Sequence, residues 1–158
     1  MTEPDRKAIS IGFPRMHKEP GERRDFLPSF IARLARLGAQ VMLEADYGAG
    51  IGFSPNDYLS VAPTAVFADH DTVYRQSYVV VLRCPSDDEI RLMHPGACLI
   101  SMLHYPTRPG RVALLRRQGL EAISLDSIKD DSGRRLIENL RAVAWNGLEA
   151  AFGVLART

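Results

Sequence analysis

The chain has 158 residues, of which 46% are hydrophobic and 25% are charged, and its formal net charge is +1. This length fits a single domain with a continuous core, and the near-neutral charge excludes a general attraction to nucleic acid or anionic membranes. No apolar run has the length of a membrane span, and residues 1–7 are polar, unlike a secretory signal. We therefore expect a cytoplasmic protein, not inserted in a membrane, that recognises its partners at local sites.

Six short apolar segments along the chain are typical of β-strands. Residues 78–82 and 97–100 are almost continuously apolar, a pattern typical of parallel strands that are covered on both faces. Cys84 and Cys98 lie at or in these strands without a metal-ligand or C-x-x-C spacing, so we expect buried free thiols and no metal site. In chain order the predicted strands are 8–13, 41–45, 66–67, 78–83, 97–102 and 122–125.

Helical patterns separate these strands. The first begins near Pro28 and ends at Gly38, and a later one covers residues 111–118. Two segments, Ser54-Pro55-Asn56-Asp57 and Ser86-Asp87-Asp88-Glu89, place a hydroxyl three residues before a carboxylate, which predicts a reciprocal cap at the start of a helix. The sequence thus alternates strand and helix.

The longest predicted helix covers residues 131–157 and begins at Asp131 or Ser132. Leucine, valine, alanine and phenylalanine side chains recur along it at helical spacing and form one apolar stripe. We expect part of this stripe, including Trp145 and Phe152, to be left uncovered unless it packs on another copy of the chain or on a missing domain. A homo-oligomer or a partner domain is therefore expected.

Alternating strands and helices predict an α/β fold with a doubly wound, mostly parallel sheet and helices on both faces, in a single domain, 1–158. Ligands of such sheets bind at the carboxyl ends of the strands. Polar residues follow four predicted strands there: the loops 17–24 and 48–52, Arg83 and His104. An arginine at this edge can hold a carboxylate through paired hydrogen bonds, and an imidazole can move a proton near neutral pH.

Each of these positions also has a purely structural interpretation. Arg24 can be a solvated loop residue or a partner of Glu22 or Asp25, and Arg83 can pair with Asp87 or Asp88. His104 can be a histidine that is hydrogen-bonded in a turn. The other histidines, His17, His70 and His94, lie in polar segments without metal-ligand spacing, and we interpret them as ordinary surface residues.

The glycines of Gly48-Ala49-Gly50-Ile51-Gly52 superficially suggest a nucleotide-binding loop. The dinucleotide fingerprint, however, has G-x-G-x-x-G directly after a strand and at the opening of a helix. Here the third glycine comes one position early, and Phe53-Ser54 precede the next helix. We therefore interpret the glycines as a tight turn with positive φ angles.

Four patches together resemble the N-terminal domain shared by alanine dehydrogenases, nicotinamide nucleotide transhydrogenases (alpha subunit) and saccharopine dehydrogenases: residues 11–14, 21–24, 48–54 and 103–104. The resemblance implies that Arg24, in a Glu-x-Arg motif, binds a substrate carboxylate. It further implies that Arg83 stands where these families have a lysine, and that His104, in a Leu-His pair, is the acid or base of catalysis. It spans nearly the whole chain, and the glycine motif followed by Phe-Ser is its most specific part.

The chain also departs from the family pattern. Arg15-Met16 stands where relatives have Lys-Glu, and a guanidinium at Arg83 stays protonated, so it can clamp a carboxylate but cannot act as a base. Residues 85–90 and 125–127 look closer to the transhydrogenase branch, which lacks a histidine corresponding to His104. The resemblance therefore does not fix the subfamily.

The resemblance implies the substrate-binding half of an NAD(P)-dependent amino-acid oxidoreductase that binds a small amino or keto acid. The cofactor, NAD or NADP, is expected on a missing or separate dinucleotide-binding domain, in cis or in trans, so we expect the isolated chain to be inactive. The alternative is a non-catalytic module for carboxylate binding, regulation or assembly that kept the fold, which the arginine at position 83 would permit.

Overall fold

A computed structural model describes residues 9–16, 25–137, 148, 152–153 and 155. The chain divides into two compact units, Met1–Leu125 and Asp126–Thr158. Among the described residues, no helix combines the length and the apolarity needed to cross a bilayer. The first unit contains all of the sheet and therefore positions the candidate site.

The first unit is built on six parallel strands in the order β3-β2-β1-β4-β5-β6. The strands are β1 (Ser10–Phe13), β2 (Gln40–Glu44), β3 (Val66–Ala68), β4 (Tyr78–Arg83), β5 (Cys98–Met102) and β6 (Glu121–Ser124). This is a common doubly wound order, in which the chain starts at the middle of the sheet and reverses direction between β1 and β4. The predicted fold class and the six predicted strands are confirmed.

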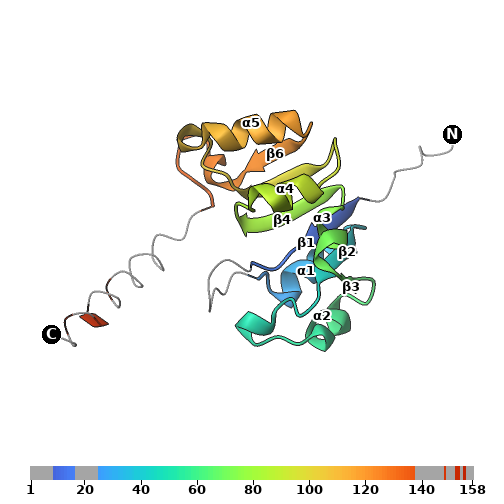
Figure 1. The fold of residues 1–158 in the computed structure, drawn as a ribbon. Coiled ribbons are helices and arrows are strands. Elements are labelled where there is room, and N and C mark those ends of the chain that lie inside the picture. The colour runs from blue at the N-terminus through green and yellow to red at the C-terminus, as the bar shows by residue number, and fades with distance from the viewer. Residues whose placement is uncertain (1–8, 17–24, 138–147, 149–151, 154, 156–158) are drawn as a thin grey trace. The chain divides into compact units, whose positions relative to one another are not determined.

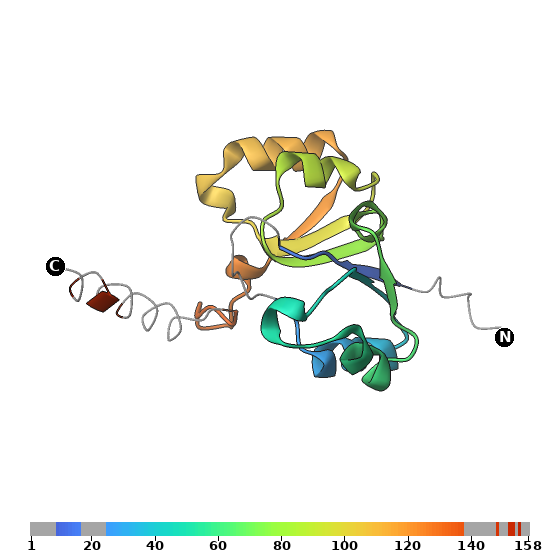
Figure 2. The same cartoon turned by 60° about the horizontal axis from the view of Figure 1, so that its bottom comes forward.

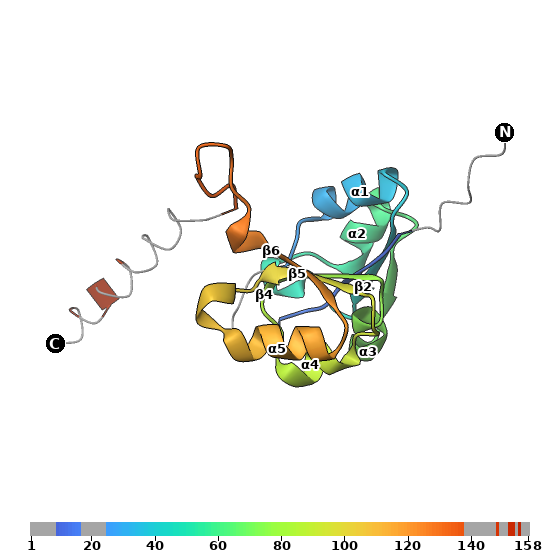
Figure 3. The ribbon, with the colours of Figure 1, turned by 90° about the horizontal axis from the view of Figure 1, so that it is seen from above.

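Helices cover both faces of the sheet (Figures 1 and 3). On one face lie α1 (Pro28–Arg36) and α2 (Pro55–Val61), and on the other lie α3 (His70–Tyr74), α4 (Asp87–Leu92) and α5 (Pro109–Arg117). Figure 2 shows the sheet edge-on between these two layers. Short 3₁₀ turns η1 (Ala49–Ile51) and η2 (Tyr105–Thr107) complete the first unit, and η3 (Leu125–Ser127) begins at its last residue.

Each face of the sheet has its own apolar core. The cluster under α1 and α2 includes Phe13, Ile31 and Leu43, and that under α3, α4 and α5 includes Val79, Ile90 and Leu99, all fully buried. In β4 and β5 the side chains facing α3, α4 and α5, such as Val81, are buried, whereas Val80 and Ile100 on the opposite face are partly buried. Both predicted free cysteines, Cys84 and Cys98, are buried.

The helix starts follow the chemistry of the sequence. Both predicted capping boxes are confirmed, at Ser54 with Asp57 and at Ser86 with Glu89. The short helix α3 is an addition to the prediction. It begins at Asp69, whose side chain accepts the backbone N–H and the hydroxyl of Thr72 at 2.9 Å and 2.7 Å.

The cap at Asp69 should be visible in its titration. Both Thr72 donors favour the ionised carboxylate, so the pKa of Asp69 is lowered. A carboxyl group whose pKa is lower in the folded than in the unfolded state stabilises the fold above its unfolded pKa, and this contribution is lost as the pH falls through the folded value. We expect Thr72→Ala to raise the pKa of Asp69, measured from the NMR shift of its carboxyl carbon. An unchanged titration would contradict this origin of the shift.

The second unit departs from the prediction at its start. The long helix expected from Asp131 or Ser132 does not begin there, because residues 131–137 form turns and Lys129 makes an antiparallel bridge with Arg135. The Asp130 carboxylate accepts the backbone N–H groups of Ser132 and Arg134, and Gly133 has a left-handed φ of 83°, so the chain turns back at this point.

Beyond residue 137 the described residues, Leu148, Phe152, Gly153 and Leu155, are helical, and the rest of the predicted helix, with Trp145, lies outside the described residues. Leu148, Phe152 and Leu155 are exposed.

Candidate functional site

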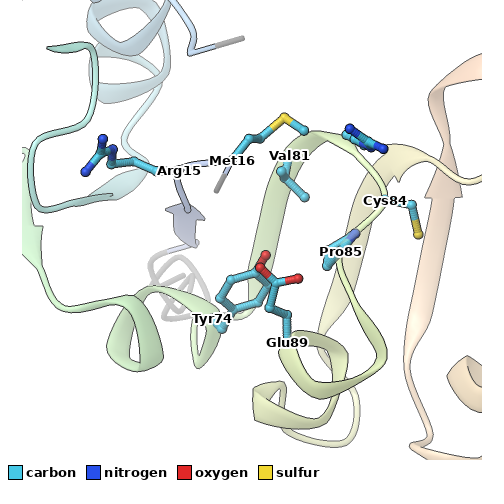
Figure 4. A pocket seen from close by; sticks show the side chains of 8 residues that line it. Arg15, Met16, Tyr74, Val81, Cys84, Pro85 and Glu89 are labelled. Carbon is cyan, nitrogen blue, oxygen red and sulfur yellow. The ribbon is translucent and has the colours of Figure 1, made fainter. Parts of the chain in front are cut away.

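A pocket lies at the carboxyl ends of β1 and β4, where the order of the strands reverses. These two strands are neighbours in the sheet, and each is followed by residues that line the pocket, Arg15 and Met16 after β1 and Cys84 and Pro85 after β4 (Figure 4). The reversal point of a doubly wound sheet is where such folds bind their ligands, because the loops after the two strands diverge to opposite faces. The enclosed part of this pocket measures about 10 Å³, roughly the room of one water molecule, within about 210 Å³ that includes open solvent. Its lining residues are Arg15, Met16, Tyr74, Val81, Arg83, Cys84, Pro85 and Glu89.

Arg83 is the predicted site residue that lines this pocket. It is the last residue of β4 and is partly exposed. The pairing of β4 with β5 shifts in register between Val80 and Arg83, so that Arg83 stands opposite Met102. Such irregularities re-aim side chains at strand ends, and here the irregularity immediately precedes the arginine.

The acidic residues that could have paired with Arg83 contact other arginines. Asp87 Oδ1 lies 3.3 Å from Arg111 Nε, and Asp88 Oδ1 lies 2.7 Å from Arg91 Nη1. Arg111 also donates to the sulfur of Cys84, at 2.8 Å, and to the carbonyl of Pro85. The guanidinium of Arg111 thereby ties the start of α5 to the two residues that follow Arg83.

His104 is at the same edge of the sheet but does not line the pocket. It lies two residues beyond Met102, the partner of Arg83, and its side chain is exposed, whereas the preceding Leu103 is fully buried. Its backbone is left-handed, with φ 49° and ψ 48°, and its carbonyl accepts the N–H of Thr107 at 3.1 Å. A non-glycine residue in this conformation is uncommon, and such residues are concentrated at functional sites. The backbone conformation is therefore a second reason to treat His104 as a candidate site residue.

Arg24 lies outside the described residues, and so does His17. The two residues that directly follow Arg24 are held by hydrogen bonds. Gly48 N–H donates to Asp25 Oδ2 at 2.8 Å, Phe26 N–H donates to the hydroxyl of Tyr47 at 2.9 Å, and the hydroxyl of Tyr58 donates to the Phe26 carbonyl at 2.8 Å. The segment 25–26 is therefore bound to the loop after β2.

The glycine motif forms the turn that the sequence predicted. Gly48 and Gly52, on either side of η1, have φ angles of 89° and 85°. A side chain at Gly48 would collide with the ring of Tyr58, so this glycine allows the loop to lie against a buried tyrosine. Burial first, and then the charge of Asp25, raises the pKa of Tyr58 to about 12, so its hydroxyl stays protonated and keeps donating.

The same turn does not fit a dinucleotide. A pyrophosphate cradle needs a glycine-rich turn that opens a helix directly after a strand, with its amides aimed at the ligand. Here the turn leads into a short 3₁₀ segment, its first amide is bonded to Asp25, and Tyr58 occupies the side that Gly48 leaves open. The residues of this turn therefore do not fit a dinucleotide.

Comparison with known proteins assigns the family. A family model described as "Alanine dehydrogenase/PNT, N-terminal domain" matches residues 12–144. The chain belongs to this family. It is 26% identical over 134 residues to the alanine dehydrogenase of Bacillus subtilis and 23% identical over 134 residues to the NAD(P) transhydrogenase subunit alpha of Haemophilus influenzae. Each match covers 85% of this chain, but only 35% and 26% of the two relatives.

Solved structures give the same assignment. An L-alanine dehydrogenase superposes with a TM-score of 0.72 at 27% identity, covering 79% of this chain and 34% of that protein. A transhydrogenase from Sinorhizobium meliloti superposes with a TM-score of 0.67 at 20% identity, covering 76% of this chain and 36% of that protein, which is a likeness in fold. The chain therefore spans between about a quarter and a third of the length of these alanine dehydrogenase/PNT relatives, from 26% to 36%.

The sequence interpretation missed a cluster of charged groups beside the pocket of this alanine dehydrogenase/PNT domain. His70, expected to be an ordinary surface residue, lies between two carboxylates, with Nδ1 at 3.0 Å from Glu44 Oε2 and Nε2 at 3.9 Å from Glu89 Oε1. Glu44 is 6% exposed at the end of the apolar strand β2. A carboxylate that closes an apolar strand was the one signal of this cluster in the sequence, because burial of a charge requires a partner.

A larger hollow of about 400 Å³ lies between α5 and β6, lined by Tyr105, Val112, Leu115, Arg116, Leu120 and Ala122. Its tyrosine hydroxyl is already bonded to the carbonyl of Ala122, at 3.1 Å. The pocket at the end of β4 is smaller, but it has arginine and glutamate side chains and lies at the strand reversal. We therefore assign the candidate site to that pocket.

Proposed function

We propose that this chain is the substrate-binding half of an NAD(P)-dependent amino-acid oxidoreductase and binds the carboxylate of a small amino or keto acid. The observation that carries the proposal is the place of Arg83, at the end of β4 in a pocket beside the end of β1. Membership of the alanine dehydrogenase/PNT N-terminal family supports it. Arg24 is proposed as the second carboxylate ligand.

The proposed roles follow from the chemistry of the side chains. A guanidinium is always protonated and presents a planar fork of donors to a carboxylate, so Arg83 binds and orients the acid but takes no proton. His104 is proposed as the group that exchanges a proton with the substrate, because imidazole changes its charge near neutral pH. The nicotinamide cofactor is proposed to be held by a dinucleotide-binding domain in cis or in trans, which leaves this chain inactive by itself.

Calorimetric titration with pyruvate and with L-alanine tests the carboxylate site. We expect Arg83→Ala to weaken binding about 10- to 100-fold, because a charge-assisted hydrogen bond contributes roughly 1.5–3 kcal/mol. Arg24→Ala should weaken it to a similar extent. Arg75→Ala is the matched control, since Arg75 is an exposed arginine paired with Asp71 at 3.4 Å and does not line the pocket. Equal affinity of Arg83→Ala and the wild-type chain would refute the assignment.

The alternative function, a carboxylate-binding or regulatory module without catalysis, is favoured by one observation: an arginine stands at the position that resembles a family lysine. Arg83→Lys separates the two functions. If the lysine variant, supplied with a dinucleotide-binding domain of an alanine dehydrogenase, oxidises L-alanine faster than the unmodified chain does, the arginine has suppressed a catalytic site. If both chains oxidise L-alanine at the same measurable rate, the result would support the oxidoreductase assignment with arginine in place.

A further inference from the structure

We propose that His70 is a positioning residue for the pocket: its imidazole joins the carboxylates of Glu44 and Glu89 and so holds three separate segments of the pocket wall in place. The proposal rests on the proposed function, because it concerns the same carboxylate site. His70 does not itself line the pocket. Its effect is exerted through residues that do.

Proton positions in this cluster follow from its hydrogen bonds. Glu44 Oε2 accepts the backbone N–H of Arg15 at 2.7 Å, so this oxygen is an acceptor. Since His70 Nδ1 lies 3.0 Å from the same oxygen, Nδ1 carries a proton. The other ring nitrogen, Nε2, faces Glu89 Oε1 at 3.9 Å, and it has a proton to offer only when the imidazole is positively charged.

The two carboxylate oxygens of Glu89 have different partners. Its Oε2 accepts the backbone N–H and the hydroxyl of Ser86, both at 2.5 Å, which fixes the start of α4. Its Oε1 faces His70. The imidazolium form of His70 therefore lies between two negative charges, one at the end of β2 and one on α4. Without its positive charge, the two carboxylates lose the cation between them.

Three pocket-lining residues depend on this arrangement. The backbone of Arg15 is bonded to Glu44, Glu89 faces His70, and the ring of Tyr74 lies 4.9 Å from the imidazole ring. In Figure 4 the carboxylate of Glu89 lies beside the Tyr74 ring, while the side chain of Arg15 points away from both. The Arg15 guanidinium is directed instead to the carbonyl of Ala45 and to Asp46, at 3.4 Å and 3.9 Å.

The charged and titratable groups around His70 come from each adjoining element. Glu44 comes from β2, Glu89 from α4 and Tyr74 from α3 itself, with Asp69 and Asp71 on either side of His70 in the chain. Burial, together with the charges of Glu89 and Glu44, raises the pKa of Tyr74, so its phenol remains neutral. The imidazole of His70 is therefore the group that bridges these two carboxylates.

Two backbone amides report on the cluster without any ligand. The Arg15 amide is bonded to Glu44, and the Ser86 amide is bonded to Glu89, so the NMR shifts of both amides should change in His70→Gln. In Glu89→Gln the shift of the Ser86 amide should change more than that of the Arg15 amide, which keeps its bond to Glu44. Shifts of both amides in His70→Gln that equal those of the unmodified chain would overturn the proposal.

Pyruvate titration then connects the cluster to the site. We expect His70→Gln to weaken pyruvate binding about three- to tenfold. His94→Gln is the matched control, because His94 is exposed and contacts the carbonyl of the adjacent Pro95. If Arg83→Ala abolishes binding while His70→Gln binds as the unmodified chain does, the positioning role is wrong and the carboxylate site stands. If Arg83→Ala has no effect, the proposed function fails, and the amide shifts alone decide the role of His70.

Discussion

Replacement of Gly12 by alanine is expected to lower the free energy of unfolding by at least about 3 kcal/mol, with a fall in melting temperature of roughly 10 °C. Gly12 lies in β1, and an added Cβ would come within 2.1 Å of the carbonyl oxygen of Val73 and 3.0 Å of its carbonyl carbon. Both are backbone atoms, so no side chain can move aside to relieve the clash. Helix α3 would have to shift away from the sheet.

The control for this substitution is Gly110→Ala. Gly110 lies in the first turn of α5, has no positive φ angle, and has open space where a Cβ would be added. Alanine is favoured over glycine in helices by roughly 0.5–1 kcal/mol, so this variant should be as stable as the unmodified chain or slightly more stable. Thermal and urea unfolding of the two variants provides the comparison. Equal stability of Gly12→Ala and Gly110→Ala would show that α3 does not press on β1 as described.

Gly48→Ala should be the second most damaging change, at about 2–4 kcal/mol, whereas Gly52→Ala should cost about 1 kcal/mol. Both glycines have left-handed φ angles, so the backbone contribution is similar at the two positions. They differ in space: a Cβ at Gly48 would lie 2.5 Å from ring atoms of Tyr58, whereas one at Gly52 has nothing within 4 Å. Tyr58 is fully buried and cannot move without losing its bond to Phe26.

Unfolding in urea measures this difference directly, because the pair of variants separates steric crowding from backbone strain. The loop of Gly48 also holds Asp25, the residue after Arg24. We therefore expect Gly48→Ala to weaken pyruvate binding as well, and Gly52→Ala to leave it nearly unchanged. Equal unfolding free energies for the two variants would mean that Tyr58 does not press against this turn.

Local patterns in the sequence determined much of the fold. The apolar runs 78–82 and 97–100 predicted the strands β4 and β5, whose side chains are buried or partly buried on both faces. The serine-to-carboxylate spacings at Ser54 and Ser86 predicted helix starts because those contacts form within a single turn. Arg83 was predicted as a strand-end arginine for the same reason: the end of an apolar run is visible in the sequence. The positive φ angles of Gly48 and Gly52 followed from residue type, but Gly50, inside η1, does not have the positive φ that was predicted for it.

Only the tertiary structure decided what lies beside what. The cluster of Glu44, His70 and Glu89 joins residues from β2, α3 and α4, and their contacts exist only because the order of the strands brings these elements together. The collision of a Cβ at Gly12 with Val73 likewise depends on the approach of α3 to β1, which no local pattern encodes. At the start of the second unit, the sequence predicted a helix from Asp131 or Ser132, but the chain forms a turn there instead. The Asp130 carboxylate accepts the N–H groups of Ser132 and Arg134, and these bonds compete with the first turn of a helix. Periodicity is set by which face of an element is buried, whereas contacts between distant residues are set by topology.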